Sequence, residues 1–129
     1  IPGSTLSIPA NGGTCGSNTS IYMGGGQAEF EFRIPMNFKD YEVTTLKLAL
    51  WRDSGNQMGL PVLELFRWDE QAWTAIQDPI QGTNVIQKAG PYINQDGTVR
   101  VRVTSEGDTF GCIYIDLGME AERMQGQGG

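Results

Sequence analysis

The chain has 129 residues, a formal charge of −6 and no histidine. We expect residues 1–129 to form one domain, because this length suits a single hydrophobic core. The acidic charge argues against nucleic acid as a partner, and the apolar runs are too short for membrane insertion. Without histidine, the chain also lacks the side chain used most often in acid–base catalysis and metal binding.

The N-terminal segment, residues 1–26, is rich in glycine, asparagine and serine. It starts at Ile1 rather than methionine, which is typical of a processed chain or of a fragment. A short strand is predicted within residues 1–10, where flanking prolines favour an edge strand. The glycine triplet at residues 24–26 has no following lysine or helix, so we expect a turn or bulge there rather than a phosphate loop.

The two cysteines, Cys15 and Cys112, lie near opposite ends of the chain. In an oxidising compartment they would form one disulfide that encloses most of the sequence. Two buried free thiols are the alternative. The processed start of the chain favours the disulfide.

Two strands with one apolar face are predicted next, over residues 27–34 and 42–51. Their apolar side chains recur at every second position, which is the period of a β-strand with one buried face. These inward-facing residues are Phe30, Phe32, Ile34, Leu46, Leu48 and Leu50.

Residues 60–76 predict a β-hairpin. Leu63 and Leu65 share one face while Glu64 points the other way, and a polar turn follows at residues 69–71. The chain then returns through Trp73, so aromatic flanks enclose a polar turn.

The remaining third of the chain alternates turns and strands. Residues 77–97 are turn-rich, with short strands expected near 85–86 and 92–93, and the pair Asp96-Gly97 is typical of a hairpin turn. Strands are predicted over 98–104, with valines facing inward, and over 110–119. Residues 120–129 read as a polar tail rich in glycine and glutamine.

Regularly spaced strands without a persuasive helix predict an all-β fold, an antiparallel β-sandwich of jelly-roll or Greek-key topology. A closed barrel is the alternative. In the sandwich, Glu29 and Glu31 would face Arg100 and Arg102 across the outer surface of one sheet and help to set its register.

No residue is predicted to be catalytic, so we expect the chain not to be an enzyme. A glycosidase would need two carboxylates beside a cleft. The acidic residues fall mainly in predicted turns, where such residues are common, and Asp116 is the exception on a strand. No serine or cysteine has a neighbouring base.

No metal or other cofactor is predicted. Zinc is set aside, and calcium is the one ion considered, because carboxylates in loops are oxygen ligands that calcium accepts. The loop carboxylates do not match the spacing of any known calcium loop; they are Asp53, Asp69, Asp96 and Asp108.

The candidate ligand-binding residues are aromatic side chains with polar neighbours: Trp51, Trp68, Asp69, Gln71 and Trp73. Exposed aromatic faces stack on sugar rings, and amide and carboxylate groups beside them hydrogen-bond to hydroxyls. The alternative is that the aromatics close the ends of the core, which we favour for Trp73 because large aromatic side chains mostly supply buried area.

Three segments together resemble the accessory β-sandwich domains of bacterial secreted and cell-surface proteins. They are LELFRWDEQAWTAI at residues 63–76, DGTVRVRVT at 96–104 and GCIYIDL at 111–117. The resemblance is one of pattern and covers about half of the chain. It implies an extracellular, non-catalytic role, in some members carbohydrate binding and in others assembly.

The sequence therefore predicts a non-catalytic binding or adhesion module, extracellular or at the cell surface, with carbohydrate as the leading ligand. The alternative is a structural subunit of a filament, coat or complex. Its partners would then be other proteins or further copies of the chain.

Overall fold

The computed structural model describes residues 1, 3–7, 13–15, 20–34, 41–52 and 61–123. Apart from one 3-10 turn at Gly90–Tyr92, regular structure in these residues is β. The strands are β1 (Gly3–Ser7), β2 (Gly13–Thr14), β3 (Ser20–Arg33), β4 (Tyr41–Arg52), β5 (Val62–Arg67), β6 (Ala72–Ala75), β7 (Gly82–Gln87) and β8 (Thr98–Arg123).

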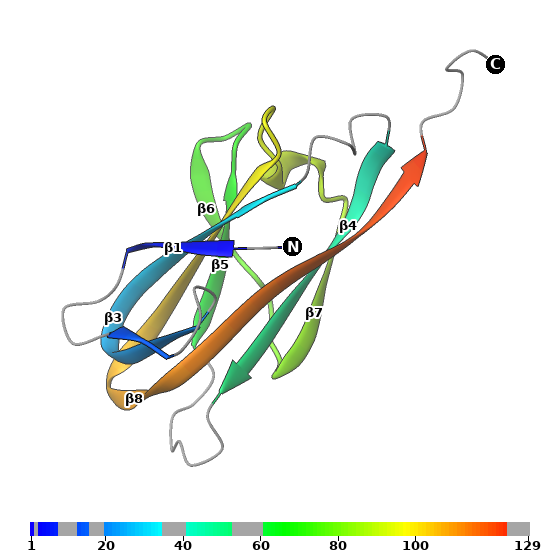
Figure 1. The fold of residues 1–129 in the computed structure, drawn as a ribbon. Helices are drawn as coiled ribbons and strands as arrows, with labels where there is room; N and C mark the ends of the chain where they lie inside the picture. The colour runs from blue at the N-terminus through cyan, green and yellow to red at the C-terminus, as the bar shows by residue number, and fades with distance from the viewer. Residues whose placement is uncertain (2, 8–12, 16–19, 35–40, 53–60, 124–129) are drawn as a thin grey trace.

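The long strands β3 and β8 pair with each other along the whole of β3. Their register shifts once, between Gly24 and Gly26, where β8 carries extra residues at 106–109. At this point both strands turn over together (Figure 1). Gly26 has a φ of 88°, a backbone conformation that glycine adopts readily. The pair therefore continues from one layer of the molecule into the other, as strands do at the corners of sandwiches.

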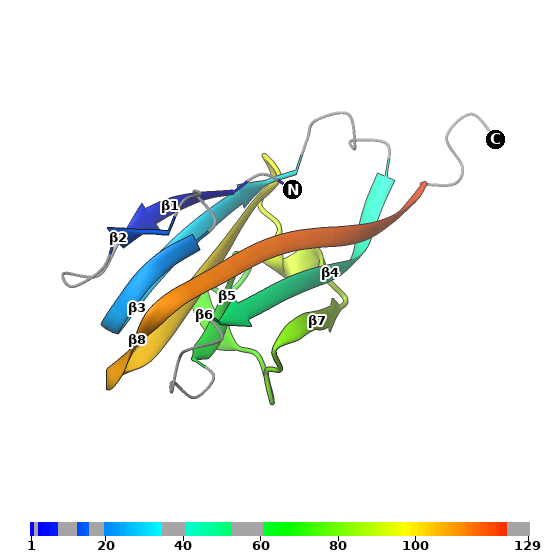
Figure 2. The same ribbon diagram turned by 60° about the horizontal axis from the view of Figure 1, so that its bottom comes forward.

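Each half of this strand pair lies in the middle of one sheet. The β6 sheet contains β1, residues 26–33 of β3, residues 98–105 of β8, β5 and β6. The β7 sheet contains β2, residues 20–24 of β3, residues 110–123 of β8, β4 and β7. Every pairing is antiparallel, and Figure 2 shows the two layers side by side.

Strand order defines the two sheets. In one sheet the neighbours run β1, β3, β8, β5, β6, and in the other β2, β3, β8, β4, β7. The chain passes repeatedly between the two sheets, as in sandwiches of jelly-roll or Greek-key topology. The predicted antiparallel β-sandwich is confirmed.

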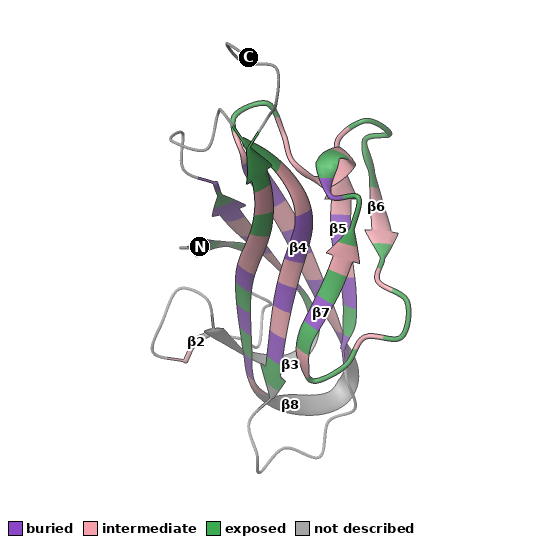
Figure 3. Cartoon of the chain, turned by 90° about the vertical axis from the view of Figure 1, so that its right-hand side faces the viewer, coloured by how far each residue is buried: buried purple, intermediate pink, exposed green. Residues whose placement is uncertain are grey.

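The core lies between the sheets and is made by the predicted inward-facing residues. Buried bands alternate with less buried ones along β4 and β8 (Figure 3). The valines of residues 98–104 and the aliphatic residues of 113–117 join those predicted on the earlier strands. The largest fully buried side chains are Phe30, Phe32, Leu46, Leu48, Leu50, Leu63, Leu65, Ile113, Ile115 and Leu117.

The predicted charged pairing on one outer surface is present in the register. Glu29 lies opposite Arg102, and Glu31 lies opposite Arg100. The ion pairs themselves are shifted, because Arg100 reaches diagonally to Glu29 at 3.0 Å. Arg102 instead turns to Glu64 on β5, at 2.9 Å.

Three details of the predicted strands are wrong. The predicted bulge at the glycine triplet is confirmed, but it lies inside β3, so the strand starts at Ser20 rather than Gln27. The segments 98–104 and 110–119 form one strand, which pairs with β4 as far as Arg123. No strand forms at residues 92–93, because Gly90 and Pro91 begin a 3-10 turn.

The turn before β8 forms without a hairpin. Asn94 and Thr98 are joined through the Asn94 N–H and the Thr98 carbonyl at 2.9 Å, and Gly97 donates its own N–H to Asn94. The predicted Asp96-Gly97 turn is therefore present, but it follows a 3-10 turn rather than a strand. Residues 124–129 of the predicted tail lie outside the described residues.

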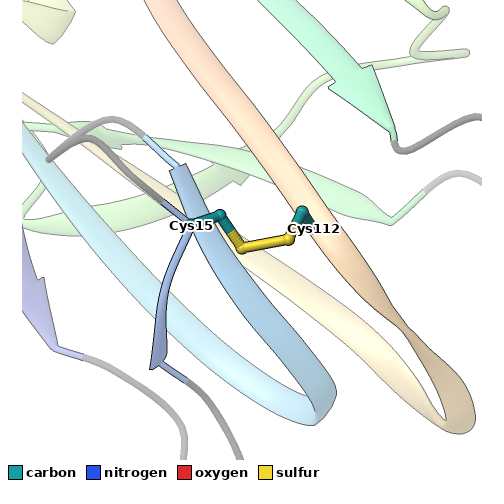
Figure 4. The surroundings of a disulfide bond; sticks show 2 residues. All are labelled: Cys15 and Cys112. Carbon is teal, nitrogen blue, oxygen red and sulfur yellow. A yellow bond between two sulfur atoms is a disulfide. The ribbon is translucent and has the colours of Figure 1, made fainter.

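The predicted disulfide joins Cys15 to Cys112 (Figure 4). Cys15 directly follows β2, which pairs with one side of β3, while Cys112 lies on β8 on the other side. The bridge spans 97 residues of sequence. In the loop-entropy model such a closure stabilises the fold by about 4 to 5 kcal/mol.

A matched pair of glycine substitutions tests the close packing at the start of β8. Gly97 has a φ of 87°, and a Cβ there would lie 2.8 Å from the Ile34 carbonyl oxygen. Gly82 has a φ of 105° with nothing within 4 Å of the same position. Gly82→Ala should lose about 1 to 2 kcal/mol of unfolding free energy through its backbone alone.

Gly97→Ala should lose about 1 to 3 kcal/mol more than Gly82→Ala, because the added methyl group also meets fixed backbone. Urea denaturation of both variants measures the difference. Equal losses would show that the contact between Gly97 and Ile34 is looser than described.

Candidate functional site

The structure divides the candidate residues between the two sheets. Trp68, Asp69, Gln71 and Trp73 lie together on the β5–β6 hairpin. Trp51 lies on β4, in the other sheet. The sequence could place the hairpin residues together because they are neighbours in the chain, whereas the place of Trp51 depends on pairing between distant strands.

The hairpin turn is held by its own polar groups. Arg67 donates two hydrogen bonds to Asp69, at 3.2 and 2.9 Å. Gln71 has a φ of 52° and donates its side-chain amide to the Trp68 carbonyl at 2.7 Å. The hydrogen bonds and the charge of Arg67 lower the pKa of Asp69 below its ordinary value. These polar groups therefore shape the turn.

The aromatic rings of the hairpin pack on one another. Phe66 makes edge-to-face contacts with Trp68 and Trp73, with ring centroids 4.9 and 5.2 Å apart. Arg102 stacks on Trp73, with its guanidinium carbon 4.4 Å from the ring centroid. One face of Trp73 is thus covered by a cation, an arrangement that stabilises the ring in place.

Trp68 is held in the same cluster. Its backbone N–H donates to the Pro91 carbonyl at 2.9 Å. Its indole N–H is buried and has no hydrogen-bond partner among the described residues. Both tryptophans of the hairpin are therefore half-buried, with rings that contact other side chains of the same chain.

Trp51 forms a different kind of surface. It lies directly opposite Tyr114 of β8, on the outer face of the β7 sheet. The two residues are 52% and 39% exposed. Directly opposite residues bring their side chains within about 5 Å of each other at Cβ. We call Trp51 and Tyr114 the aromatic pair.

Tyr114 lies within the strand predicted over residues 110–119, but the candidate set drawn from the sequence does not include it. The signal that would have found it is the pairing of β4 with β8, which brings it opposite Trp51. Alternation along one strand shows which side chains point outward. It does not show which outward side chains of two strands are neighbours.

A disulfide and a carboxylate flank the aromatic pair along β8. Side chains two residues apart share a face of a strand, so Cys112 precedes and Asp116 follows Tyr114 on this surface. Asp116 is exposed, and Ala49 lies opposite it. One of its oxygens accepts the Leu117 N–H at 2.9 Å.

A polar pocket lies at the far end of the same sheet, with a volume of about 500 Å³. Ends of β4, β7 and β8 line it. Its ionisable residues are Glu42, Lys88, Glu120 and Glu122. Nearby, Lys47 forms an ion pair with Glu120 at 2.7 Å.

Two of the four loop carboxylates considered for calcium have side chains that the structure describes, and both make contacts within their own turns. Asp69 is bound to Arg67, and Asp96 accepts the Thr98 N–H at 3.2 Å. Asp53 lies outside the described residues, and only the backbone of Asp108 is described. Within the part of the chain that is described, no three acidic or cysteine side chains are arranged to hold a metal ion.

Together these features define a β-sandwich domain with an exposed aromatic pair on one sheet and a self-packed aromatic hairpin on the other. The chain belongs to the family described as a domain of unknown function (DUF8815), whose model matches residues 1–121. No curated protein matches the chain.

A solved structure resembles the chain weakly, with 13% sequence identity and a TM-score of 0.40. The match covers 94% of this chain and 54% of the other, so this chain spans about half of that protein. The work on that structure is described as "Structural basis for the promiscuous specificity of the carbohydrate-binding modules from the beta-sandwich super family".

The described residues contain no helix with the length and apolar character needed to cross a membrane.

The pair formed by Arg67 and Asp69 predicts a pH-dependent contribution to stability. The pKa of Asp69 is lowered in the folded state. Its contribution is therefore fully present above the ordinary carboxyl pKa and is lost as the pH falls through the lower, folded-state value. Wild type should melt at a higher temperature than Asp69→Asn at neutral pH, and the difference should shrink as the pH falls below the ordinary aspartate pKa of about 3.9.

Thermal melts across this pH range measure the effect. Glu70→Gln is the matched control, because Glu70 lies on the same turn but is farther from Arg67, at 3.9 Å compared with 2.9 Å for Asp69. A difference between wild type and Asp69→Asn that is the same at every pH would contradict the assignment.

Proposed function

We propose that the chain is a non-catalytic, extracellular binding module for carbohydrate, and that the aromatic pair is its binding surface. The observation that carries the proposal is the exposure of Trp51 and Tyr114 side by side on paired strands. Soluble domains usually bury large aromatic side chains, so two exposed neighbours indicate an interaction surface.

Sugars fit such a surface for a chemical reason. A pyranose ring has an apolar face of C–H groups and a rim of hydroxyls. The apolar face stacks on an aromatic ring, and polar groups at the edge hydrogen-bond to the hydroxyls. Asp116, next to Tyr114 on the same face, supplies such a group.

The hairpin residues are weaker candidates for ligand contact. Arg102 covers one face of the Trp73 ring. Asp69 and Gln71 already hydrogen-bond within the turn. A ligand would have to replace these contacts, whereas the ring of Trp51 is exposed to solvent.

An extracellular location agrees with the disulfide, since such bonds persist in oxidising compartments and are rare in the cytosol. The resemblance of residues 63–76, 96–104 and 111–117 to accessory domains of secreted bacterial proteins supports the same location.

Alanine substitution of Trp51 tests the binding surface. On a glycan array followed by calorimetry with the best ligand, Trp51→Ala should weaken binding about tenfold or more, as expected for a central aromatic contact. Val62→Ala, which removes an exposed apolar side chain from the other sheet, should bind like wild type. Loss of binding in Trp73→Ala but not in Trp51→Ala would move the site to the hairpin.

A structural subunit of an extracellular assembly is the second candidate. β7 ends the described strand order of its sheet. Val85 on this strand and Ile80 just before it are 55% and 54% exposed. Edge strands with exposed apolar side chains are sites where chains pair with one another.

Light scattering on the intact protein distinguishes the two functions. A binding module should have a mass near that of one chain, 14.1 kDa. An assembly subunit should form a larger defined species that Val85→Lys dissociates. If the protein stays monomeric at high concentration, the assembly function is ruled out.

A further inference from the structure

We propose that the aromatic pair selects glycans that carry protonated amino groups over neutral and acidic glycans. This inference rests on the proposed function and names the ligand class of the same site. It follows from the charges that surround Trp51 and Tyr114.

Asp116 is the charged group of β8 next to the aromatic pair. One of its oxygens accepts the Leu117 N–H, which leaves the other oxygen for a ligand. No ion pair to Asp116 is formed among the described residues, and the side chain opposite, Ala49, is small and uncharged. An exposed carboxylate without an ion-pair partner among the described residues therefore lies beside two exposed aromatic rings.

The nearest described lysine on this face is already neutralised. Lys47 precedes Trp51 by four residues on β4 and forms a 2.7 Å ion pair with Glu120. Farther along, the polar pocket is lined by three glutamates and one lysine, Lys88. The N-terminal ammonium of Ile1 is a further cation near Asp116, and it donates to the Leu117 carbonyl at 2.9 Å. The carboxylates along this face, together with the overall charge of −6, nevertheless favour cations.

Aromatic faces and a carboxylate together form the environment that proteins use to bind ammonium groups. An amino sugar would stack its C–H face on a ring and direct its ammonium group to Asp116. A uronic acid or a sulfated sugar would instead place its negative charge next to the carboxylate. Like charges brought together in this way disfavour the complex.

Oligosaccharides of equal length that differ in their charged groups test the inference by calorimetry at low salt. The probes are β-1,4-linked glucosamine, its N-acetylated form, and galacturonate. The glucosamine oligomer should bind best, and its advantage over the acetylated form should shrink as salt is added. Galacturonate should bind most weakly.

Asp116→Asn should reduce the affinity for the glucosamine oligomer about two- to fivefold, the effect expected of one exposed ion pair. It should leave the acetylated oligomer unaffected. Glu70→Gln is the matched control, because it removes the same charge from the hairpin of the other sheet and should change neither affinity.

The outcomes separate the two proposals. If the oligomers bind equally well, or galacturonate binds best, and Trp51→Ala abolishes binding, the glycan site stands and the charge selection is overturned. If Asp116→Asn and Glu70→Gln have equal effects, the attraction is one of net charge and the selection by Asp116 is overturned. If no glycan binds, or Trp51→Ala binds as wild type does, both proposals fail.

Discussion

The fold depends on β3 and β8 bending together and pairing on both sides of the bend. The register shifts at Gly24–Gly26, and each sheet contains one half of the β3–β8 ladder. The inner face of that ladder supplies Phe30, Phe32 and the inward residues of β8 to both sides of the core. The other strands add to its edges, β5 and β6 in one sheet and β4 and β7 in the other. A sandwich of two antiparallel sheets follows from this constraint together with the pairings of the other strands.

The same strand pair explains why the two outer faces differ. On the β6 sheet, the outward arginines of β8 reach Glu29 and Glu64, and they also lie over Trp73. The charged groups on that face therefore form ion pairs, and the arginines also contact the ring of Trp73. On the β7 sheet, the outward residues of β8 are Tyr114 and Asp116, and β4 offers no described cation beside them except Lys47, which Glu120 neutralises. The second face is left with open aromatic and acidic groups.

Local alternation was enough to predict the core and most strands, because a buried face imposes its period of two directly on the sequence. It could not show that β3 continues through three glycines, since that depends on the pairing of Gly24 and Gly26 with β8. It also paired Arg102 with β3, because the competing Glu64 comes from a strand whose place in the sheet depends on long-range register. Tyr114 was left out of the site for the same reason.

The position of the aromatic pair on paired strands has a consequence for binding. Hydrogen bonds to neighbouring strands fix the backbone of Trp51 and Tyr114, so a ligand bound at the proposed site would order few additional groups. The disulfide at Cys112, two residues before Tyr114, ties the same strand to the segment after β2. Aromatic groups on a turn would first have to be ordered, and those of the β5–β6 hairpin are ordered only by contacts that also cover them. The exposed pair is thus both open and preorganised, which is the combination that a recognition surface needs.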